Sequence, residues 1–406
     1  MIATLIPLFD NKQKVRAYSI LAQRENHFLQ TGLIGLGYLD GANIVAGFDI
    51  VDTMGVETLS GDGEVFVELN NISVFTDLDE QCHAPHEKLV LMVDDTITTE
   101  EMYVNRLREL KEKGYQLAIR NQAINQFEPF RQILLLMDYI LLNHRKIKID
   151  YAKIYFGKVY PNIKLCAVGV DTQEDYDKLT AQGGYDLYEG RFFRTPVNDS
   201  DKVLAPLKVN YIHLLNVVNE PDFDLTAAAD VIGRDTALIL SVLEIANRLS
   251  RGGEITSVQH AVAMLGQKEL KKWINTAVTK ELCADKPNEL TRFSLLRAKF
   301  AENLAPVFNQ AMQAQELFLM GLFSTIDIML DKPIEEALNM VQVSKNIREA
   351  LLSHDGALYP VLHFMLEYEN AAWTEVFRIL VVEDIDMNDT YRAYLDALAW
   401  YRELFT

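Results

Sequence analysis

The chain has few of the features that mark disulfide-rich, zinc-binding, secreted or membrane-spanning proteins. Its 406 residues include three cysteines, Cys82, Cys166 and Cys283, and no CxxC spacing of the kind found in zinc sites. An odd number of distant cysteines does not suit a disulfide framework, so we expect buried or incidental thiols. No apolar run reaches the roughly 18 residues of a membrane span. The first residues lack a cationic start followed by a long apolar stretch, and we expect a cytoplasmic protein.

Positive charge is also scarce. The 39 Lys and Arg residues are outnumbered by 58 Asp and Glu residues, so the formal net charge is -19. Such a field repels phosphate backbones and anionic membrane surfaces, and neither nucleic acid nor a membrane is expected as a partner. A hydrophobic content of 49% supports well-filled cores and argues against a largely disordered chain.

The first half alternates short apolar runs with amphipathic helical stretches. This order predicts an α/β architecture with a mainly parallel sheet, and the number of repeats suits a closed TIM-like (βα) barrel. Among the helices, Thr99–Lys113 has apolar residues at helical spacing, and Asp171–Gln182 begins like a capping box. The expected strands are Ala3–Pro7, Ile44–Ala46, Glu64–Leu69, Leu89–Val93, Gln116–Ile119, Tyr139–Leu142, Lys164–Val168 and Leu187–Tyr188.

The second half has almost no strand signals. Residues 197–206 break both periodicities and are interpreted as a linker, so we expect a barrel domain over 1–198 and an all-α domain over 206–406. Gly266 is expected to end one helix in a left-handed conformation. The predicted helices cover 206–219, 225–232, 235–249, 257–265, 267–283, 289–308, 311–330, 333–338, 342–351, 358–367, 371–382 and 388–404.

The strand in the segment GYQLAIRNQ, residues 114–122, ends on Arg120 and Asn121. Catalytic groups of parallel barrels lie at the C-terminal ends of strands. A metal enzyme would need carboxylates there, because hard cations take charged oxygen ligands. This strand end offers a fixed cation and a neutral amide instead.

Several segments of the first half occur in the order of the motifs of one enzyme family. They are Tyr18-Ser19-Ile20, Asn71-Ile72-Ser73, the run Leu89 to Asp95, Gly114 to Gln122, Asp138 to Asn143, Ala167 to Thr172, and Glu189 to Phe193 with Pro196. In this order they resemble the EAL domain, the cyclic-di-GMP phosphodiesterase barrel. The resemblance implies hydrolysis of a phosphodiester by two divalent metals held by acidic and amide side chains.

The residues at the family's ligand and catalytic positions have changed together. Asn71, for which Asn70 is an alternative alignment, keeps the family's Asn, and among the later motifs only Asp171 keeps a carboxylate. Asp94 and Asp95 are offset from the ligand position at Met92. We therefore predict no catalytic residue, no metal site and no cofactor. The vestigial barrel-mouth positions are Tyr18, Asn71, Met92, Arg120, Asn121, Leu141, Asn143, Val168, Asp171 and Glu189.

The mouth could still bind a nucleotide without hydrolysing it. Arg120 could pair with a phosphate, and Phe192 and Phe193 could provide aromatic surface. We favour the alternative, in which Arg120 forms a structural hydrogen bond or salt bridge and both phenylalanines belong to the core and rim. Binding of cyclic-di-GMP is accordingly not expected.

The second half resembles the HDOD domain, a helical relative of the HD phosphohydrolases. The resemblance lies in Leu214–Asp222, Ala227–Ile232, Asp235–Leu238, Leu243–Asn247, Ile255–Gly266, Trp273, Arg297-Ala298 and Phe318–Phe323 with Asp327. An HD enzyme needs a His-Asp pair on a core helix. The pair His354-Asp355 instead lies in Ser353-His-Asp-Gly356, which is typical of a loop turn.

The two resemblances together imply a catalytically inactive EAL–HDOD protein of bacterial signal transduction. Such a protein would act by contacts with protein partners, and a homodimer is one option. The first alternative is a non-hydrolytic sensor of cyclic-di-GMP or another nucleotide at the barrel mouth. The second is a residual metal-dependent phosphodiesterase that uses Asn71, Asp94, Asp95 and Asp171.

Overall fold

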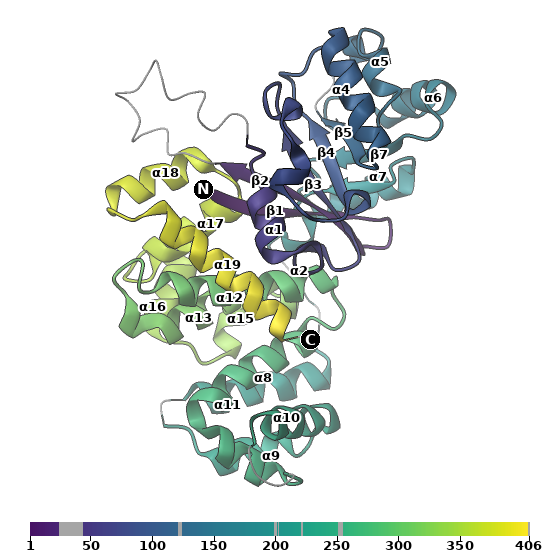
Figure 1. Ribbon diagram of the computed structural model, residues 1–406. Helices are drawn as coiled ribbons and strands as arrows, with labels where there is room; N and C mark the ends of the chain where they lie inside the picture. Colours follow the sequence, from purple (N-terminus) through teal and green to yellow (C-terminus); the bar gives the residue numbers. More distant parts are fainter. Residues whose placement is uncertain are drawn as a thin grey trace. The chain divides into compact units, whose positions relative to one another are not determined.

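The structure is a computed structural model that describes residues 1–23, 44–120, 124–198, 201, 203–220, 222–250 and 255–404 (Figure 1). The chain divides into two compact units. The barrel unit contains Met1–Thr195, Asn303–Met312 and His363–Thr406, and the helical unit contains Pro196–Glu302 and Gln313–Leu362. Each unit is described below by itself.

Eight strands close into a barrel in the order of the sequence. β1 is antiparallel to both of its neighbours, β2 and β8, and all other neighbouring pairs are parallel. This confirms the predicted α/β barrel. The strands are β1 Ile2–Phe9, β2 Val15–Gln23, β3 Glu64–Leu69, β4 Leu89–Val93, β5 Gln116–Arg120, β6 Tyr139–Asn143, β7 Lys164–Val168 and β8 Leu187–Glu189.

The strand expected at Ile44–Ala46 is wrong. The second strand is β2, which pairs with β1 over its whole length. The amide of Val45 donates to Gln81 Oε1 at 2.9 Å instead of to a neighbouring strand, and Gly47, at φ 100°, starts the next helix. The short apolar run at 44–46 therefore leads into a helix, because its backbone groups have no strand partner.

Helices and short loops connect the strands of the barrel. The α-helices are α1 Phe48–Met54, α2 Val56–Ser60, α3 Leu78–Gln81, α4 Glu101–Glu112, α5 Arg131–Leu134, α6 Ile149–Val159 and α7 Gln173–Gln182. α4 buries Val104, Leu107 and Leu110, which follow the spacing read from the sequence. The capping residue of α7 is Thr172, whose hydroxyl accepts from the Asp175 amide at 3.1 Å.

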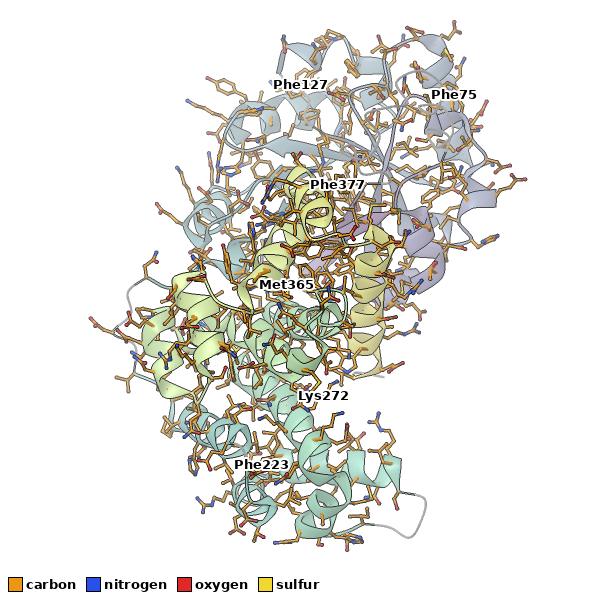
Figure 2. The ribbon with its side chains drawn as sticks, turned by 90° about the vertical axis from the view of Figure 1, so that its left-hand side faces the viewer. Phe75, Phe127, Phe223, Lys272, Met365 and Phe377 are labelled. Carbon is orange, nitrogen blue, oxygen red and sulfur yellow. The ribbon has the colours of Figure 1, made fainter. Side chains whose placement is uncertain are left out.

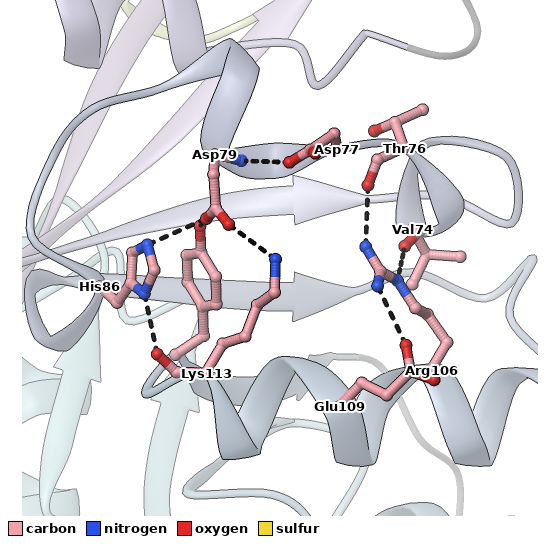
Figure 3. A network of polar contacts seen from close by, with 9 residues as sticks. Val74, Thr76, Asp77, Asp79, His86, Arg106, Glu109 and Lys113 are labelled. Carbon is pink, nitrogen blue, oxygen red and sulfur yellow. Dashed lines mark hydrogen bonds and ion pairs between the residues drawn. The ribbon is translucent and has the colours of Figure 1, made fainter.

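A polar network joins α3 and α4 on the outside of the barrel (Figure 3). Asp79 accepts hydrogen bonds from Lys113 Nζ at 2.6 Å and from the Tyr115 hydroxyl at 2.8 Å, and His86 Nε2 lies 3.0 Å from the same carboxylate. The hydrogen bond from Lys113 lowers the pKa of Asp79. Nearby, Arg106 donates to two backbone carbonyls of the loop that follows β3. These contacts fix the outer helices and leave the barrel interior to the strands.

The helical unit is built from α8 Pro206–Asn219, α9 Leu225–Ile232, α10 Thr236–Leu249, α11 Val258–Leu282, most of α12 Asn288–Leu304, α13 Ala314–Phe323, α14 Ile326–Leu330, α15 Ile334–Met340 and α16 Lys345–Arg348. α11 breaks at Gly266, where φ is 70° and ψ is 171°. The positive φ fits the predicted helix end, whereas the ψ is extended and not left-handed helical. The helices predicted at 289–308 and 311–330 are shorter, because 305–310 form turns and α13 ends before Ser324.

The last three helices belong to the barrel unit. They are α17 Tyr359–Glu369, of which residues from His363 on lie in this unit, α18 Trp373–Val382 and α19 Met387–Glu403. α19 contacts β1, and the Tyr368 hydroxyl accepts from the Ala3 amide at 3.3 Å. Arg194 forms an ion pair with Glu369 at 3.3 Å. None of the helices in the described residues is long and apolar enough to span a membrane.

Candidate functional site at the barrel mouth

Side chains that line the barrel interior follow the two-residue alternation of the strands. Leu8, Phe66 and Tyr139 lie in one buried cluster in the interior. Met92 and Leu141 belong to the same cluster, with Val168 packed against it. The parallel register aligns Arg120 with Leu141, Asn143 with Val168, and Val168 with Glu189. Six of the predicted mouth positions, Met92, Arg120, Leu141, Asn143, Val168 and Glu189, therefore share the inner face at the strand ends.

Arg120 and Glu189 form the central contact of the mouth. Arg120 Nη2 donates to Glu189 Oε2 at 2.6 Å, and the side chains are 15% and 5% exposed. Ser19 Oγ donates to the same Oε2 at 2.9 Å, and Arg120 Nε lies 3.2 Å from Met92 Sδ. The salt bridge that was one of the two contacts predicted for Arg120 is thus present. The guanidinium lies between an acidic and a thioether side chain and joins β4, β5 and β8 across the interior.

Two acidic residues, Glu68 and Asp94, also lie at the barrel mouth. The sequence did not predict that they would accompany the Arg120–Glu189 pair. Burial raises the pKa of Glu68, Arg120 opposes this change, and Asp94, Asp95 and Glu189 reinforce it. Burial also raises the pKa of Asp94, whose carboxylate accepts from the Thr96 amide and hydroxyl. The mouth therefore combines the Arg120 guanidinium with several carboxylates, of which Glu189 is buried, Asp94 is half-buried, and Glu68 and Asp95 belong to exposed residues.

Sequence reasoning missed Ser19 and Glu68. The alternation of β2 places Ala17 in the interior cluster and Ser19 against Glu189, so Tyr18, which is also buried, has the opposite orientation. Glu68 lies two residues after Phe66 of the interior cluster, and this spacing could have identified it.

The remaining predicted positions do not converge with the Arg120–Glu189 pair. Asp171 is half exposed and faces Arg145 at 3.5 Å. The Asn71 amide donates to Thr96 Oγ1 at 2.8 Å, away from the pair. Asn121 lies outside the described residues. In the described part of the chain, no group of three or more His, Cys, Asp and Glu side chains is arranged to hold a metal ion.

The two phenylalanines after β8 belong to the core. Phe192 and Phe193 are 1% and 6% exposed. Phe192 stacks on Tyr176 with ring centroids 4.1 Å apart, and Phe9 packs against both phenylalanines. Their rings are therefore used for packing, which agrees with the interpretation favoured from the sequence.

The His-Asp pair of the second half lies in a turn, as predicted. His354 has a φ of 53° and follows a short helical segment, and Asp355 Oδ1 accepts from the Gly356 amide at 2.8 Å. Both residues are exposed. This position offers no convergence of ligands from a helical core.

Comparison with known proteins identifies the class of the second half. Residues 204–354 match the model of the HDOD domain family, so the chain carries an HDOD domain beside its eight-stranded barrel. Over 98% of its length the chain is 28% identical to the uncharacterized protein YuxH of Bacillus subtilis strain 168, of which 97% is covered. It is also 24% identical to the cyclic di-GMP phosphodiesterase CdgJ of Vibrio cholerae, over 79% of this chain and 74% of CdgJ.

Solved structures similar to the chain are EAL domain proteins. The EAL enzyme Bd1971, in its cAMP- and cyclic-di-GMP-bound form, matches 48% of this chain with 13% identity and a TM-score of 0.36. The match covers 62% of that protein, which is less than two thirds of its length. The EAL-like domain protein YdiV matches 47% of this chain and 89% of its own, with 11% identity and a TM-score of 0.35.

Proposed function

We propose that this chain is an EAL–HDOD protein of cyclic-di-GMP-related signalling that acts by binding other proteins and not by hydrolysis. The observation that carries the proposal is the 2.6 Å contact between Arg120 and Glu189 at the mouth. A two-metal hydrolase needs oxygen ligands that converge on its cations. Here the carboxylate at the end of β8 is already paired with a permanent cation.

The neighbours of this pair further weaken the case for a metal-dependent phosphodiesterase. Met92, Leu141 and Val168 supply no charged oxygen ligands, and they fill the interior with apolar volume. Guanidinium does not deprotonate in proteins, so Arg120 would repel a divalent ion at every accessible pH. Losing a single orienting partner reduces metal affinity or activity by roughly 10–100-fold. The combined changes are expected to remove turnover.

The surface charge supports a protein partner more than a nucleotide. A net charge of -19 favours association with a partner that has a basic patch. At the mouth itself, the charges of Arg120, Asp94 and Asp95 all act on Glu68, and the three carboxylates would repel a phosphodiester. We therefore place cyclic-di-GMP sensing second. The observation that supports sensing is the guanidinium of Arg120, which could pair with a phosphate.

Calorimetry and a hydrolysis assay with cyclic-di-GMP test the proposal, with and without Mg²⁺ or Mn²⁺. CdgJ is the positive control. We expect neither saturable heat nor turnover from this chain. Saturable binding without turnover would instead support the sensor. Metal-dependent turnover that is lost in both Asp171→Ala and Glu189→Gln would establish an enzyme and refute the proposal.

The second part of the test concerns the partner. Affinity capture of the full chain from its native cells, followed by reconstitution of the candidate pair from purified components, is expected to give a stable complex. The complex should weaken as salt rises, because the acidic surface contributes to it. A chain that retains no partner and elutes alone under native conditions would contradict the interaction role.

A further inference from the structure

A cavity in the helical unit gathers lysine side chains in an otherwise acidic protein. It has a volume of about 160 Å³ and lies among α11, α12 and α13. Its lining consists of Lys268, Glu269, Lys271, Lys272, Asn275, Glu302, Gln315, Phe318 and Leu319. All of these residues belong to the same compact unit. The cavity is therefore independent of how the two units are placed.

The regular geometry of α11 creates the cationic wall. Lys268, Lys271, Lys272 and Asn275 occur at intervals of three and four residues after the break at Gly266, so they share one face of the helix. Figure 2 labels Lys272, which extends from α11. Its ammonium lies 5.7 Å from the centre of the buried Phe318 ring. The opposite wall comes from α13 and is partly apolar.

The charges around the cavity do not balance. Lys272 and Lys299 both contact Glu302 Oε2, at 3.1 and 2.7 Å. The lining itself holds three lysines, Lys268, Lys271 and Lys272, and two carboxylates, Glu269 and Glu302, so one positive charge is in excess.

Lys271 is the most informative member of this set. It is half-buried, and its ammonium has no hydrogen bond or ion pair among the residues that the structure describes. Burial lowers its pKa, and no neighbouring acid opposes that effect. A half-buried ammonium without a counter-ion carries a desolvation cost, which an anion in the cavity would offset.

We propose that this cavity binds a small phosphate-type anion through Lys271, with Lys268 and Lys272 as additional donors. Three ammonium groups around one small volume suit a phosphate-type dianion better than a monocarboxylate. The volume is well below the roughly 300–1,000 Å³ of pockets for drug-sized ligands, so a cyclic dinucleotide does not fit. The site goes beyond the proposed function and does not depend on it.

Calorimetric titration of the full chain with inorganic phosphate and with pyrophosphate, at constant ionic strength, tests the site. We expect saturable binding that Lys271→Met weakens at least tenfold, which is the size of one charge-assisted hydrogen bond. Lys271→Arg keeps the charge and should retain affinity within a few-fold. Lys280→Met alters an exposed lysine of α11 outside the cavity and should leave binding unchanged.

A variant with the opposite effect gives a sharper test. Glu302→Gln keeps the side-chain shape and releases Lys272 and Lys299, so phosphate should bind several-fold more tightly. Acetate, as a monoanion, should bind at least tenfold more weakly than phosphate. The proposal is wrong if neither phosphate nor pyrophosphate binds saturably, or if Lys271→Met binds them as the unaltered chain does. Circular dichroism of each variant shows whether it is folded, and Lys271→Gln, which also removes the charge and should weaken binding in the same way, replaces Lys271→Met if that variant is not.

Discussion

Replacing Arg120 with Met is expected to destabilise the barrel strongly. The change keeps the aliphatic stem of the side chain but removes the guanidinium that pairs with Glu189 at 2.6 Å. The carboxylate of Glu189 is only 5% exposed and would keep the hydroxyl of Ser19 as a donor at 2.9 Å. Removing one partner of a buried ion pair costs about 3–5 kcal/mol. Because Arg120 retains 15% exposure, we expect the lower end of this range.

Two matched variants isolate the cause. In Arg120→Met/Glu189→Gln the side chain at 189 is neutral, so most of the lost stability should return. Arg131→Met removes an exposed arginine whose partner, Glu128, lies 3.8 Å away, with both side chains more than 60% exposed. Exposed pairs contribute about 0–1 kcal/mol, and this control should behave almost like the unaltered chain.

Hydrogen exchange measured by mass spectrometry suits this test, because it reports on the barrel separately from the helical unit. Peptides from β5 and β8 should exchange much faster in Arg120→Met, and the double variant should restore their protection. Equal protection in Arg120→Met and Arg131→Met would refute the view that the pair stabilises the mouth. Such a result would also weaken the argument against a metal site, because that argument depends on the same contact.

Three further changes test other parts of the chain. Gly321→Ala would place a methyl group 2.7 Å from a backbone oxygen of α12 and should cost about 1–3 kcal/mol of unfolding free energy, seen as a lower melting temperature. Gly157→Ala, in the open on α6, should gain up to about 1 kcal/mol. Asp235→Ala removes the cap of α10 and should cost about 1–2 kcal/mol in urea unfolding, with local exchange at that helix as the cross-check. Burial raises the pKa of Asp327, so the folded state holds its proton more tightly and stability falls as pH rises through this pKa. Asp327→Asn should therefore melt higher than the unaltered chain near pH 7 and lose this advantage below about pH 4; an advantage independent of pH would contradict the assignment.

The sequence predicted most of the barrel because its parallel strands are buried on both faces and read as short apolar runs. It did not predict β2, whose segment VRAYSILAQ is interrupted by polar residues and is stabilised by long antiparallel pairing with β1. It placed a false strand at Ile44–Ala46, because three apolar residues do not reveal whether their amides find a strand partner. A local sequence pattern therefore does not distinguish such a short apolar run from a strand.

At the mouth, sequence alone could identify which side chains had been lost but not which contacts replaced them. Arg120 and Glu189 are 69 positions apart, and their pairing depends on the closure of the barrel. The place of Ser19 beside Glu189 became visible only when the inner face of β2 was known. Likewise, the sequence predicted the helix that became α19 but not the contact of this helix with β1.

The division of the chain into two interleaved units has a consequence for how the protein is made. The chain crosses between the units four times, and the last segment of the barrel unit is His363–Thr406. During synthesis the strands emerge long before the helices that cover them, so the barrel unit reaches its final form only when translation ends. A shortened protein that stops after the eighth strand would expose the surface that Tyr368 and its neighbours cover. Experiments on isolated halves would then report on aggregation-prone fragments, and cuts at the ends of the HDOD match would separate segments that fold together.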